Sequence, residues 1–255
     1  MRQMEVAMQL HYPALAAPFD SALQAAVADV LAQYDPVGII AAGSVIRGVG
    51  SPSSDIDLYV IHLARFRQRL QRRYAGVPCE IFVNPPDQVR RYFEDEHFHG
   101  RPITAHLLAT GTVLLDQDPI VQNLRNEAAK WLATAPTPGD ERLRWLRYLL
   151  VDQADNVRDV AAVDPALARL LLGEMLPQLA TYCFLAAGHH LPRRKDVLTG
   201  LAQLDAAAAA EMRAIVNAAD LGAALVVTEA LMQRVMGVTT FFTWDSAPEE
   251  VKLVD

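Results

Sequence analysis

The sequence from Gly43 to Asp57 reads Gly-Ser-Val-Ile-Arg-Gly-Val-Gly-Ser-Pro-Ser-Ser-Asp-Ile-Asp. An apolar run, residues 37–42, precedes it, and Leu58-Tyr-Val-Ile follows with the apolar and β-branched composition of a strand. Side chains alternate faces along a strand, so Asp55 and Asp57 are expected to project to the same side. Two adjacent carboxylates repel each other unless a positive charge lies between them. Mg²⁺, which prefers hard oxygen ligands, would supply that charge.

Three short pieces of this stretch occur in order: Gly43-Ser44, Arg47-Gly48 and Ser54-Asp55-Ile-Asp57-Leu. Together they resemble the signature of the DNA polymerase β-type nucleotidyltransferase superfamily. In that family the Gly-Ser turn holds the triphosphate of an NTP, and the paired aspartates hold two metal ions. The resemblance therefore implies that Asp55 and Asp57 bind two Mg²⁺ ions. It also implies nucleotide binding by a set of loop residues: Gly43, Ser44, Arg47 and Ser54.

A third carboxylate is expected on a neighbouring strand, and Glu80 lies in a second strand-like run, Val-Pro-Cys-Glu-Ile-Phe-Val. Members of the family often carry Asp at this place, and several antibiotic-modifying members carry Glu. Two interpretations of Glu80 stay open, because it either completes the metal shell or acts as general base for an attacking hydroxyl. Two also stay open for Arg47, which either contacts phosphate or forms a structural salt bridge.

The reaction that the resemblance implies is attack by an acceptor hydroxyl on the α-phosphorus of ATP or another NTP, with release of pyrophosphate. A small α/β domain followed by helices also resembles the layout of aminoglycoside and other antibiotic nucleotidyltransferases. This layout implies a small-molecule acceptor, such as an aminoglycoside or a lincosamide. Two alternatives remain: an antitoxin-type enzyme that modifies a protein or tRNA, and a non-catalytic nucleotide-binding scaffold.

Bulk properties limit the partners. The chain has 30 acidic and 23 basic residues, a formal net charge of −7, which argues against nucleic acid as a partner. Cys79 and Cys183 each lie in an apolar segment, as buried free thiols of a reducing cytoplasm do. The N-terminus has no apolar core of signal-peptide length, and no uncharged run has membrane-spanning length. We therefore expect a cytoplasmic monomer or homodimer that does not bind membranes.

The fold class predicted is an α/β (α+β) nucleotidyltransferase domain with a small mixed sheet, followed by an all-α helical bundle. Residues 134–139 are rich in Pro, Gly and Thr and are predicted to be a linker. The predicted domains therefore cover residues 1–135 and 136–255. Predicted strands cover residues 37–42, 55–61, 79–83 and 111–116. Predicted helices of the first domain cover residues 20–34, 64–74, 103–110 and 118–132, with a further helix starting near residue 84. Those of the second cover residues 141–163, 165–187, 195–204, 206–219 and 221–236.

Four charged groups outside the signature have two interpretations each. Lys195 either reaches the triphosphate, as the lysine of some adenylyltransferases does, or belongs to a solvated basic turn. Asp152, Asp155 and Asp159 share one helix face that either meets a polycationic acceptor or faces water. The arginine-dense residues 64–74 are predicted to be a solvated helix face rather than an RNA grip. Residues 94–99, which contain two histidines, are predicted to be an exposed loop rather than a metal site.

Overall fold

The computed structural model describes residues 9–246 and residue 248. The chain forms two compact units, and the boundary between them lies between Thr134 and Ala135. The first unit combines a mixed sheet with helices, and the second consists of helices joined by short connections. This arrangement confirms the predicted architecture, a small mixed sheet with helices followed by a helical unit.

Five strands form the sheet of the first unit, in the order β3-β4-β2-β1-β5. β2 runs parallel to β4, whereas the pairs β1–β2, β1–β5 and β3–β4 are antiparallel. β1 and β2 are buried along almost their whole length, which explains their nearly continuous apolar composition. The strands are β1 Pro36–Ala42, β2 Ile56–His62, β3 Gln68–Tyr74, β4 Val77–Asn84 and β5 Thr112–Asp116.

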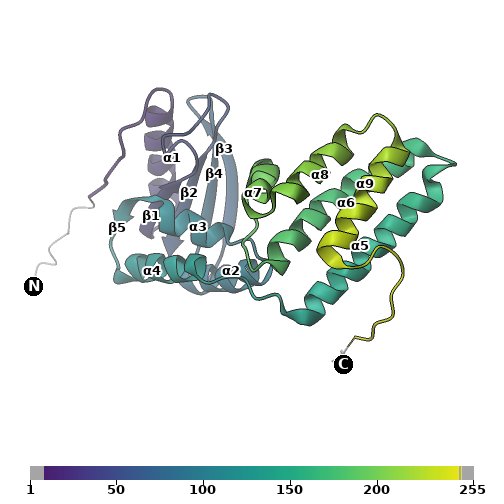
Figure 1. Cartoon of the computed structure of the whole chain (residues 1–255). Coiled ribbons are helices and arrows are strands. Elements are labelled where there is room, and N and C mark those ends of the chain that lie inside the picture. Colours follow the sequence, from purple (N-terminus) through teal and green to yellow (C-terminus); the bar gives the residue numbers. More distant parts are fainter. Residues whose placement is uncertain (1–8, 247, 249–255) are drawn as a thin grey trace, which may run out of the picture. The chain divides into compact units, whose positions relative to one another are not determined.

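Helices cover both faces of this sheet (Figure 1). The helices of the first unit are α1 Phe19–Gln33, α2 Pro86–Phe98, α3 Ile103–Thr110 and α4 Pro119–Ala133. α1 packs on one face, where Leu23 and Val27 belong to the same core as Leu58. The other three helices cover the opposite face, where Phe93 and Leu108 share a core with Tyr59. Because residues alternate along β2, Asp57 projects to the face of Tyr59, away from α1.

Strand β3 corrects one prediction, because the sequence predicts a helix over residues 64–74. β3 and β4 form a hairpin around Ala75 and Gly76, which have positive φ angles of 48° and 83°. Positive φ at both central residues is typical of the tight turns that join two antiparallel strands. Arginine and leucine are good helix formers, so local propensity favours the helix. Pairing with β4 outweighs that preference.

The second correction concerns residues 94–99, predicted as an exposed loop. Residues 94–98 are the last turns of α2, and His99 is its C-cap. Glu96 accepts hydrogen bonds from the backbone N and from Oγ1 of Thr104, at 2.6 and 2.8 Å, at the start of α3. The ring of His97 lies 4.9 Å from that of Trp131 in α4. These side chains therefore join α2 to α3 and α4.

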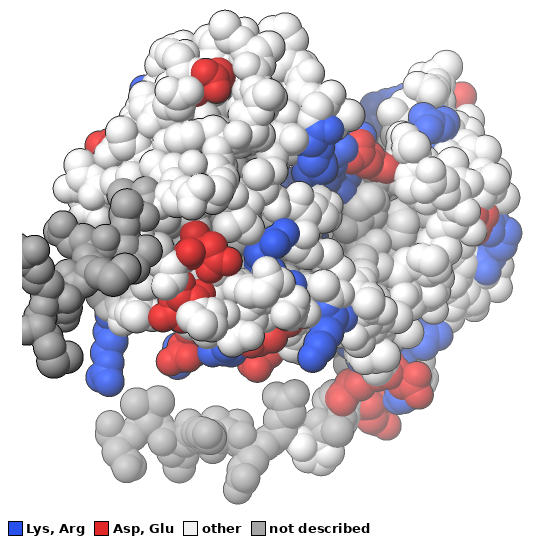
Figure 2. All heavy atoms as spheres, turned by 90° about the vertical axis from the view of Figure 1, so that its left-hand side faces the viewer, with Lys and Arg blue, Asp and Glu red and all other residues white. Residues whose placement is uncertain are grey.

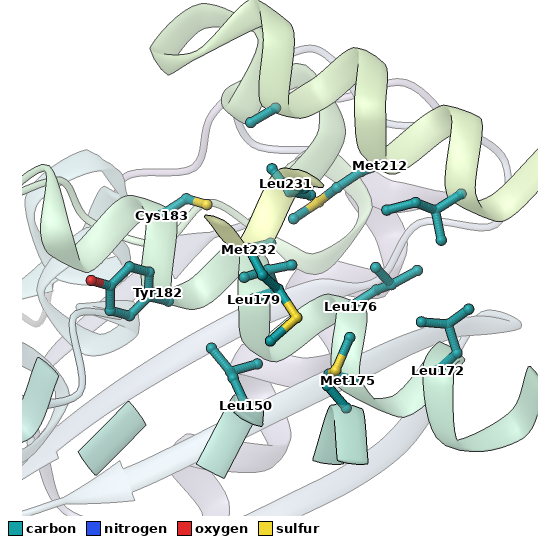
Figure 3. Packing of buried hydrophobic residues seen from close by; sticks show 14 of the residues in the cluster. Leu150, Leu172, Met175, Leu176, Leu179, Tyr182, Cys183, Met212, Leu231 and Met232 are labelled. Atoms are coloured by element: carbon teal, nitrogen blue, oxygen red, sulfur yellow. The ribbon is translucent and has the colours of Figure 1, made fainter. Parts of the chain in front are cut away.

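The helices of the second unit pack around a core of their own. They are α5 Gly139–Ala161, α6 Pro165–Ala186, α7 Val197–Leu204, α8 Ala206–Asn217 and α9 Leu221–Met236, with a 3-10 turn at Arg194–Asp196. Figure 3 shows Leu150 of α5, Met175 and Leu179 of α6, and Met232 of α9 directed into this core. Each of these side chains is fully buried, as expected where amphipathic helices turn their apolar faces inward.

The surface charge and the length of the helices were also compared with the sequence analysis. On the face drawn in Figure 2, acidic and basic side chains lie in small mixed groups between uncharged residues. Opposite charges at close range offset each other, so the potential over this face is mixed in sign. Among residues 9–246, no helix combines the length and the apolar composition needed to cross a bilayer.

Candidate active site

The backbone of the loop after β1 lies close to the carboxylate of Asp57. Gly43 has a φ of 96°, and a Cβ added there would lie 3.0 Å from Oδ2 of Asp57. Glycine alone adopts this conformation without strain and leaves this space. Backbone hydrogen bonds from Arg47 to Gly43 (3.3 Å) and from Val49 to Ser44 (3.0 Å) keep the turn tight. Gly43 therefore allows the loop and the strand β2 to meet closely.

Serine hydroxyls hold the same loop together. Ser44 donates a hydrogen bond to Oγ of Ser54 at 3.0 Å, and the backbone N–H of Ser51 donates to the same oxygen at 2.8 Å. Ser54 thus links the two ends of the loop. The sequence analysis does not single out Ser51, although the run Ser-Pro-Ser-Ser is a turn signal in which such hydrogen bonds are common.

Two of the three predicted carboxylates lie on adjacent strands. In the parallel pairing of β2 with β4, Asp57 lies directly beside Glu80. Paired residues on neighbouring strands project from the same face of a sheet, so the two carboxylates are neighbours. Asp55 comes one residue before β2 and is exposed, whereas Asp57 and Glu80 are half-buried.

The charge of these groups alters the titration of Asp57. Burial, together with the negative charges of Asp55 and Glu80, raises the pKa of Asp57 to about 6. Arg47 and Arg69 act in the opposite direction on this pKa, which shows that both guanidinium groups influence the site. Burial is the largest cause of the raised pKa, and the part that comes from the like charges of Asp55 and Glu80 would be relieved by a cation. The raised pKa of Asp57 therefore marks a place where positive charge is favoured.

Glu80 is held by two side chains of β3 that the sequence analysis does not assign to the site. Nη2 of Arg69 and Nε2 of Gln71 both donate to Oε1 of Glu80, at 2.6 and 2.7 Å. The two donors alternate along β3 and so project from the face that carries Glu80. The sequence analysis missed Arg69 and Gln71 because it predicted a helix over residues 64–74. In a helix, residues i and i+2 do not share a face. The two-residue turn after Tyr74 is the signal that could have revealed the strand.

A cation site has suitable ligand chemistry here but is not preassembled. Among the described residues, no three Asp, Glu, His or Cys side chains are already gathered closely enough to hold a metal ion. The candidate donors Asp55, Asp57 and Glu80 are all carboxylates, the hard oxygen ligands that Mg²⁺ prefers. The donor set therefore fits Mg²⁺ by its chemistry.

A pocket of about 840 Å³ opens beside Asp57 and Glu80, between the sheet and helices α2 and α3. Tyr59 and Phe82 lie under it with stacked rings, their centroids 5.9 Å apart. Side chains of α2 and α3, among them Tyr92 and Leu107, line its far wall. This volume is in the range of small-molecule sites. A smaller pocket of about 360 Å³ lies along the β3–β4 edge and shares Glu80.

The remaining candidates lie in the second unit. Lys195 is exposed in the 3-10 turn before α7, where its neighbours Arg193 and Asp196 form an ion pair at 2.5 Å. On α5, Asp155 pairs with Arg158 at 2.5 Å, whereas Asp152 and Asp159 are exposed. The ion pair of Asp155 reduces the negative charge of the predicted acidic face. A role for Lys195 or for this helix face stays a prediction.

A solved structure of a nucleotidyltransferase-like protein from Exiguobacterium sibiricum is similar to this chain, with a TM-score of 0.51 and 15% sequence identity. The match covers 84% of this chain and 74% of that chain. No protein-family model matches the sequence, and no curated protein is similar enough to count as a relative. At this identity the similarity shows the fold alone. The fold is that of a nucleotidyltransferase followed by a helical unit.

Proposed function

We propose that this protein is a Mg²⁺-dependent nucleotidyltransferase that moves a nucleoside monophosphate, AMP from ATP, to a hydroxyl of a small molecule. The observation that carries this proposal is the strand register that sets Asp57 beside Glu80, next to the Gly43 turn. The raised pKa of Asp57 supports it, because perturbed carboxylates gather at functional sites. The nucleotidyltransferase-like fold supports the reaction class by analogy.

The Gly43–Ser54 loop is the proposed phosphate site. Backbone N–H groups that follow a glycine turn bind phosphate oxygens, and the Ser44 hydroxyl adds a donor beside them. Ser54 keeps Ser44 in place through their hydrogen bond. Arg47 adds positive charge, which already acts on Asp57 and would act on a triphosphate there. A role of Lys195 in nucleotide binding stays a prediction of the sequence resemblance.

Asp55 and Asp57 are the proposed ligands of two Mg²⁺ ions, with Glu80 as the third carboxylate. Bound Mg²⁺ supplies charge neutralisation to the reacting phosphate. Of the two roles of Glu80, the hydrogen bonds from Arg69 and Gln71 favour general base over metal ligand, because a guanidinium already occupies Oε1. These bonds orient the carboxylate and leave Oε2 for the substrate.

The proposed transfer is one in-line displacement. The acceptor O–H bond breaks and its proton moves to Glu80, while a bond forms between the acceptor oxygen and the α-phosphorus. The bond from the α-phosphorus to the pyrophosphate oxygen breaks at the same time. Positioning and charge neutralisation supply most of the catalysis in such reactions. An aminoglycoside or a lincosamide is the acceptor class that the sequence resemblance implies.

Nucleotidyl transfer is tested with purified protein, Mg²⁺, each of four α-labelled NTPs and a panel of aminoglycosides, lincosamides and aryl glycosides. Labelled acceptor and pyrophosphate are measured for the wild type and for Asp57→Asn. The variant should lose about 10²–10³-fold in rate, the usual scale for removing a group that stabilises transition-state charge. Asp29→Asn is the matched control, because Asp29 bonds Arg72 and Tyr74 on the α1 side of the sheet. Wild-type pyrophosphate release no greater than that of Asp57→Asn, for every NTP and acceptor, would contradict the proposal.

A second candidate function, a nucleotide-binding scaffold without turnover, is favoured by one observation. Arg69 already forms an ion pair with Glu80, and among the described residues the carboxylates are not gathered into a metal cluster. Titration calorimetry with ATP and Mg²⁺ separates the two functions. ATP binding that Asp57→Asn leaves unchanged, together with no labelled product, would support the scaffold.

A further inference from the structure

Strand β3 lies at one edge of the five-stranded sheet, and among the described elements it pairs with β4 alone. Its residues are exposed or half-buried, whereas β1 and β2 in the middle of the sheet are almost completely buried. The side of β3 that faces away from β4 therefore has no neighbouring strand within the described part of the chain.

The register of the β3–β4 hairpin shows which backbone groups face outward. Two residues form the turn, so the residues that flank it, Tyr74 and Val77, exchange both backbone hydrogen bonds. Bonded and non-bonded pairs then alternate along β3. Pro78, which has no N–H, lies opposite Arg73 in a non-bonded pair, which agrees with this alternation. The residues of β3 whose N–H and C=O groups point away from β4 are therefore Arg69, Gln71 and Arg73.

These outward groups are not satisfied by another element. Within residues 9–246, no backbone hydrogen bond joins the outer side of β3 to a loop, a helix or a strand. At the opposite edge, the N–H of His11 donates to the carbonyl of Leu114 in β5, at 2.9 Å. The segment before α1 thus bonds to the β5 edge, and the β3 edge stays open. An open edge is a template on which an extended segment of another chain can pair.

Basic side chains determine which kind of strand can pair there. Residues 63–76, which comprise β3 and its flanking loops, contain five arginines and no acidic residue. Ion pairs offset two of these charges, because Arg69 pairs with Glu80 and Arg72 pairs with Asp29. Three arginines have no carboxylate partner among the described residues: Arg65, Arg67 and Arg73.

The contacts of these three arginines are with neutral groups or with solvent. Arg73 donates to the carbonyl of Gly76 at 3.1 Å. Asp55 shares the smaller pocket with Arg73, but the two do not form an ion pair in the described structure. Arg67 donates to the hydroxyl of Tyr92 on α2, and Arg65 is exposed. Their positive charge is therefore available to a partner.

The other carboxylates near this strand are engaged elsewhere. β4 separates Asp57 on β2 from β3. Glu96 shares the larger pocket with Arg67, but both its oxygens accept hydrogen bonds from Thr104. The outer edge therefore keeps an excess of positive charge. Like charges directly opposite destabilise a strand pair, so β3 of a second copy fits poorly there, and an acidic strand fits well.

We infer that the open edge of β3 is a docking site for an extended, acidic segment of a partner protein, which adds a further strand to the sheet. Acidic side chains at alternate positions of that segment face Arg69 and Arg73, and the side chains between them face Leu70. The docked segment lies beside the candidate active site, because Arg69 also holds Glu80. The inference goes beyond nucleotidyl transfer and does not depend on it.

Binding is measured by fluorescence anisotropy with the full-length protein and without NTP or Mg²⁺, so that failure of nucleotidyl transfer leaves the result unaffected. The labelled probes are Thr-Glu-Val-Glu-Thr-Glu-Val-Glu, the same peptide with Lys in place of Glu, and an oligouridylate of equal length. The acidic peptide should bind at least about tenfold more tightly than the basic peptide. It should also bind more tightly than the oligouridylate, which has negative charge but no strand-forming backbone. Any other order of affinities, or no binding of the acidic peptide, overturns the inference.

Hydrogen exchange shows whether the peptide pairs as a strand. In the ¹⁵N-labelled full-length protein, saturation with the acidic peptide should slow exchange of the Arg69, Gln71 and Arg73 amides by at least about tenfold. The amides of Leu70 and Arg72, which already bond to β4, should change little. Protection that does not alternate in this way, or no protection at all, overturns the placement at the β3 edge.

Two pairs of variants separate the backbone from the charge. Gln71→Pro removes an outward N–H, a change that an edge strand tolerates, and should bind the acidic peptide about three- to tenfold more weakly than Gln71→Ala. Arg73→Glu should weaken the acidic peptide at least about threefold, whereas Arg213→Glu, at an exposed position of α8, should not. Equal affinities within both pairs would contradict the docking site.

Discussion

Leu58 and Asp57 are neighbours in strand β2, but one side chain lies in an apolar core and the other in a charged site. Leu58 is fully buried against α1, in a core that consists of apolar side chains. Asp57 projects from the other face, where Asp55 and Glu80 crowd it and a pocket opens. One face of the strand therefore stabilises the first unit, and the other keeps a charge that folding disfavours. Functional groups are often held in such unfavourable places by a well-packed support.

The largest expected effect is on the packed face. Leu58→Ala should lower the free energy of unfolding of the first unit by about 2–5 kcal/mol, because it removes buried apolar contacts and leaves a cavity. Hydrogen exchange of the β1 and β4 amides measures this local stability. Leu63→Ala, at an exposed position after the same strand, is the control and should cost less than about 0.5 kcal/mol. Equal costs for the two variants would contradict the comparison.

On the other face, Asp57→Asn should stabilise the metal-free protein in a pH-dependent way. The pKa of Asp57 is raised to about 6 in the folded state, so between pH 4 and 6 the folded protein keeps a proton that the unfolded chain has lost. Stability of the wild type therefore falls as pH rises through this window, by about 3 kcal/mol in total. The amide of the variant does not titrate, so the advantage of Asp57→Asn should grow from pH 4 to 6 and then stay constant.

Urea unfolding at several pH values measures this difference, and Asp29→Asn is a control of opposite sign. Hydrogen bonds from Tyr74 and Arg72 hold the pKa of Asp29 below its usual value, with the Tyr74 bond the larger cause. The stability that Asp29 contributes is therefore present above about pH 4 and lost as pH falls. Mg²⁺ should narrow the gap between the wild type and Asp57→Asn, because a ligand of the folded state stabilises it. A gap that neither pH nor Mg²⁺ changes would contradict the prediction.

A smaller effect is expected where the loop meets Asp57. Gly43→Ala should cost about 1–2 kcal/mol from the left-handed backbone alone, and its Cβ would also push against Oδ2 of Asp57. Gly48→Ala is a matched control, because it has a φ of 74° but nothing within 4 Å of its added Cβ. Gly48→Ala should lose somewhat less stability than Gly43→Ala, and nucleotidyl transfer should fall only in Gly43→Ala. Equal loss of transfer would mean that contact with Asp57 is unimportant.

The smallest effect on stability is expected for the two arginines of β3, which should differ only in their effect on nucleotidyl transfer. Arg69 and Arg72 both form ion pairs, with Glu80 on the pocket side and with Asp29 on the α1 side. The side chain of Arg69 is 62% exposed, and such pairs contribute about 0–1 kcal/mol, so either Arg→Gln variant should unfold almost like the wild type. Only Arg69→Gln should change the pH profile of nucleotidyl transfer, because Arg69 orients Glu80. An identical change in both variants would argue against a positioning role.

The parts of the molecule that could be predicted share one property. Residues 37–42 and 55–61 have a strand composition that tertiary pairing does not contradict, and they became β1 and β2. The loop between them needs glycine and short polar side chains for its turn, so its place in the fold follows from residue type. The helices of the second unit were likewise recognisable from the apolar faces that now form their core.

The predictions that were wrong depend on partners distant in the chain. Residues 68–74 have helical propensity, but pairing with β4 makes them a strand. Residues 94–97 are polar, yet they belong to α2, where Glu96 accepts hydrogen bonds from Thr104 and His97 contacts Trp131. Helix propensity and polarity alone predict neither outcome, because the deciding contacts come from other elements; for β3 only the turn at Ala75 and Gly76 is a local signal.

The sequence by itself determined the Gly43 turn, the carboxylates Asp55 and Asp57, and the two-part layout, since each depends on local backbone geometry or on periodicity. The tertiary structure alone decided that Glu80 lies beside Asp57, that Arg69 and Gln71 hold it, and that Tyr59 lines a pocket. The physical reason is strand register: one residue of slip would turn each of these side chains to the opposite face of the sheet.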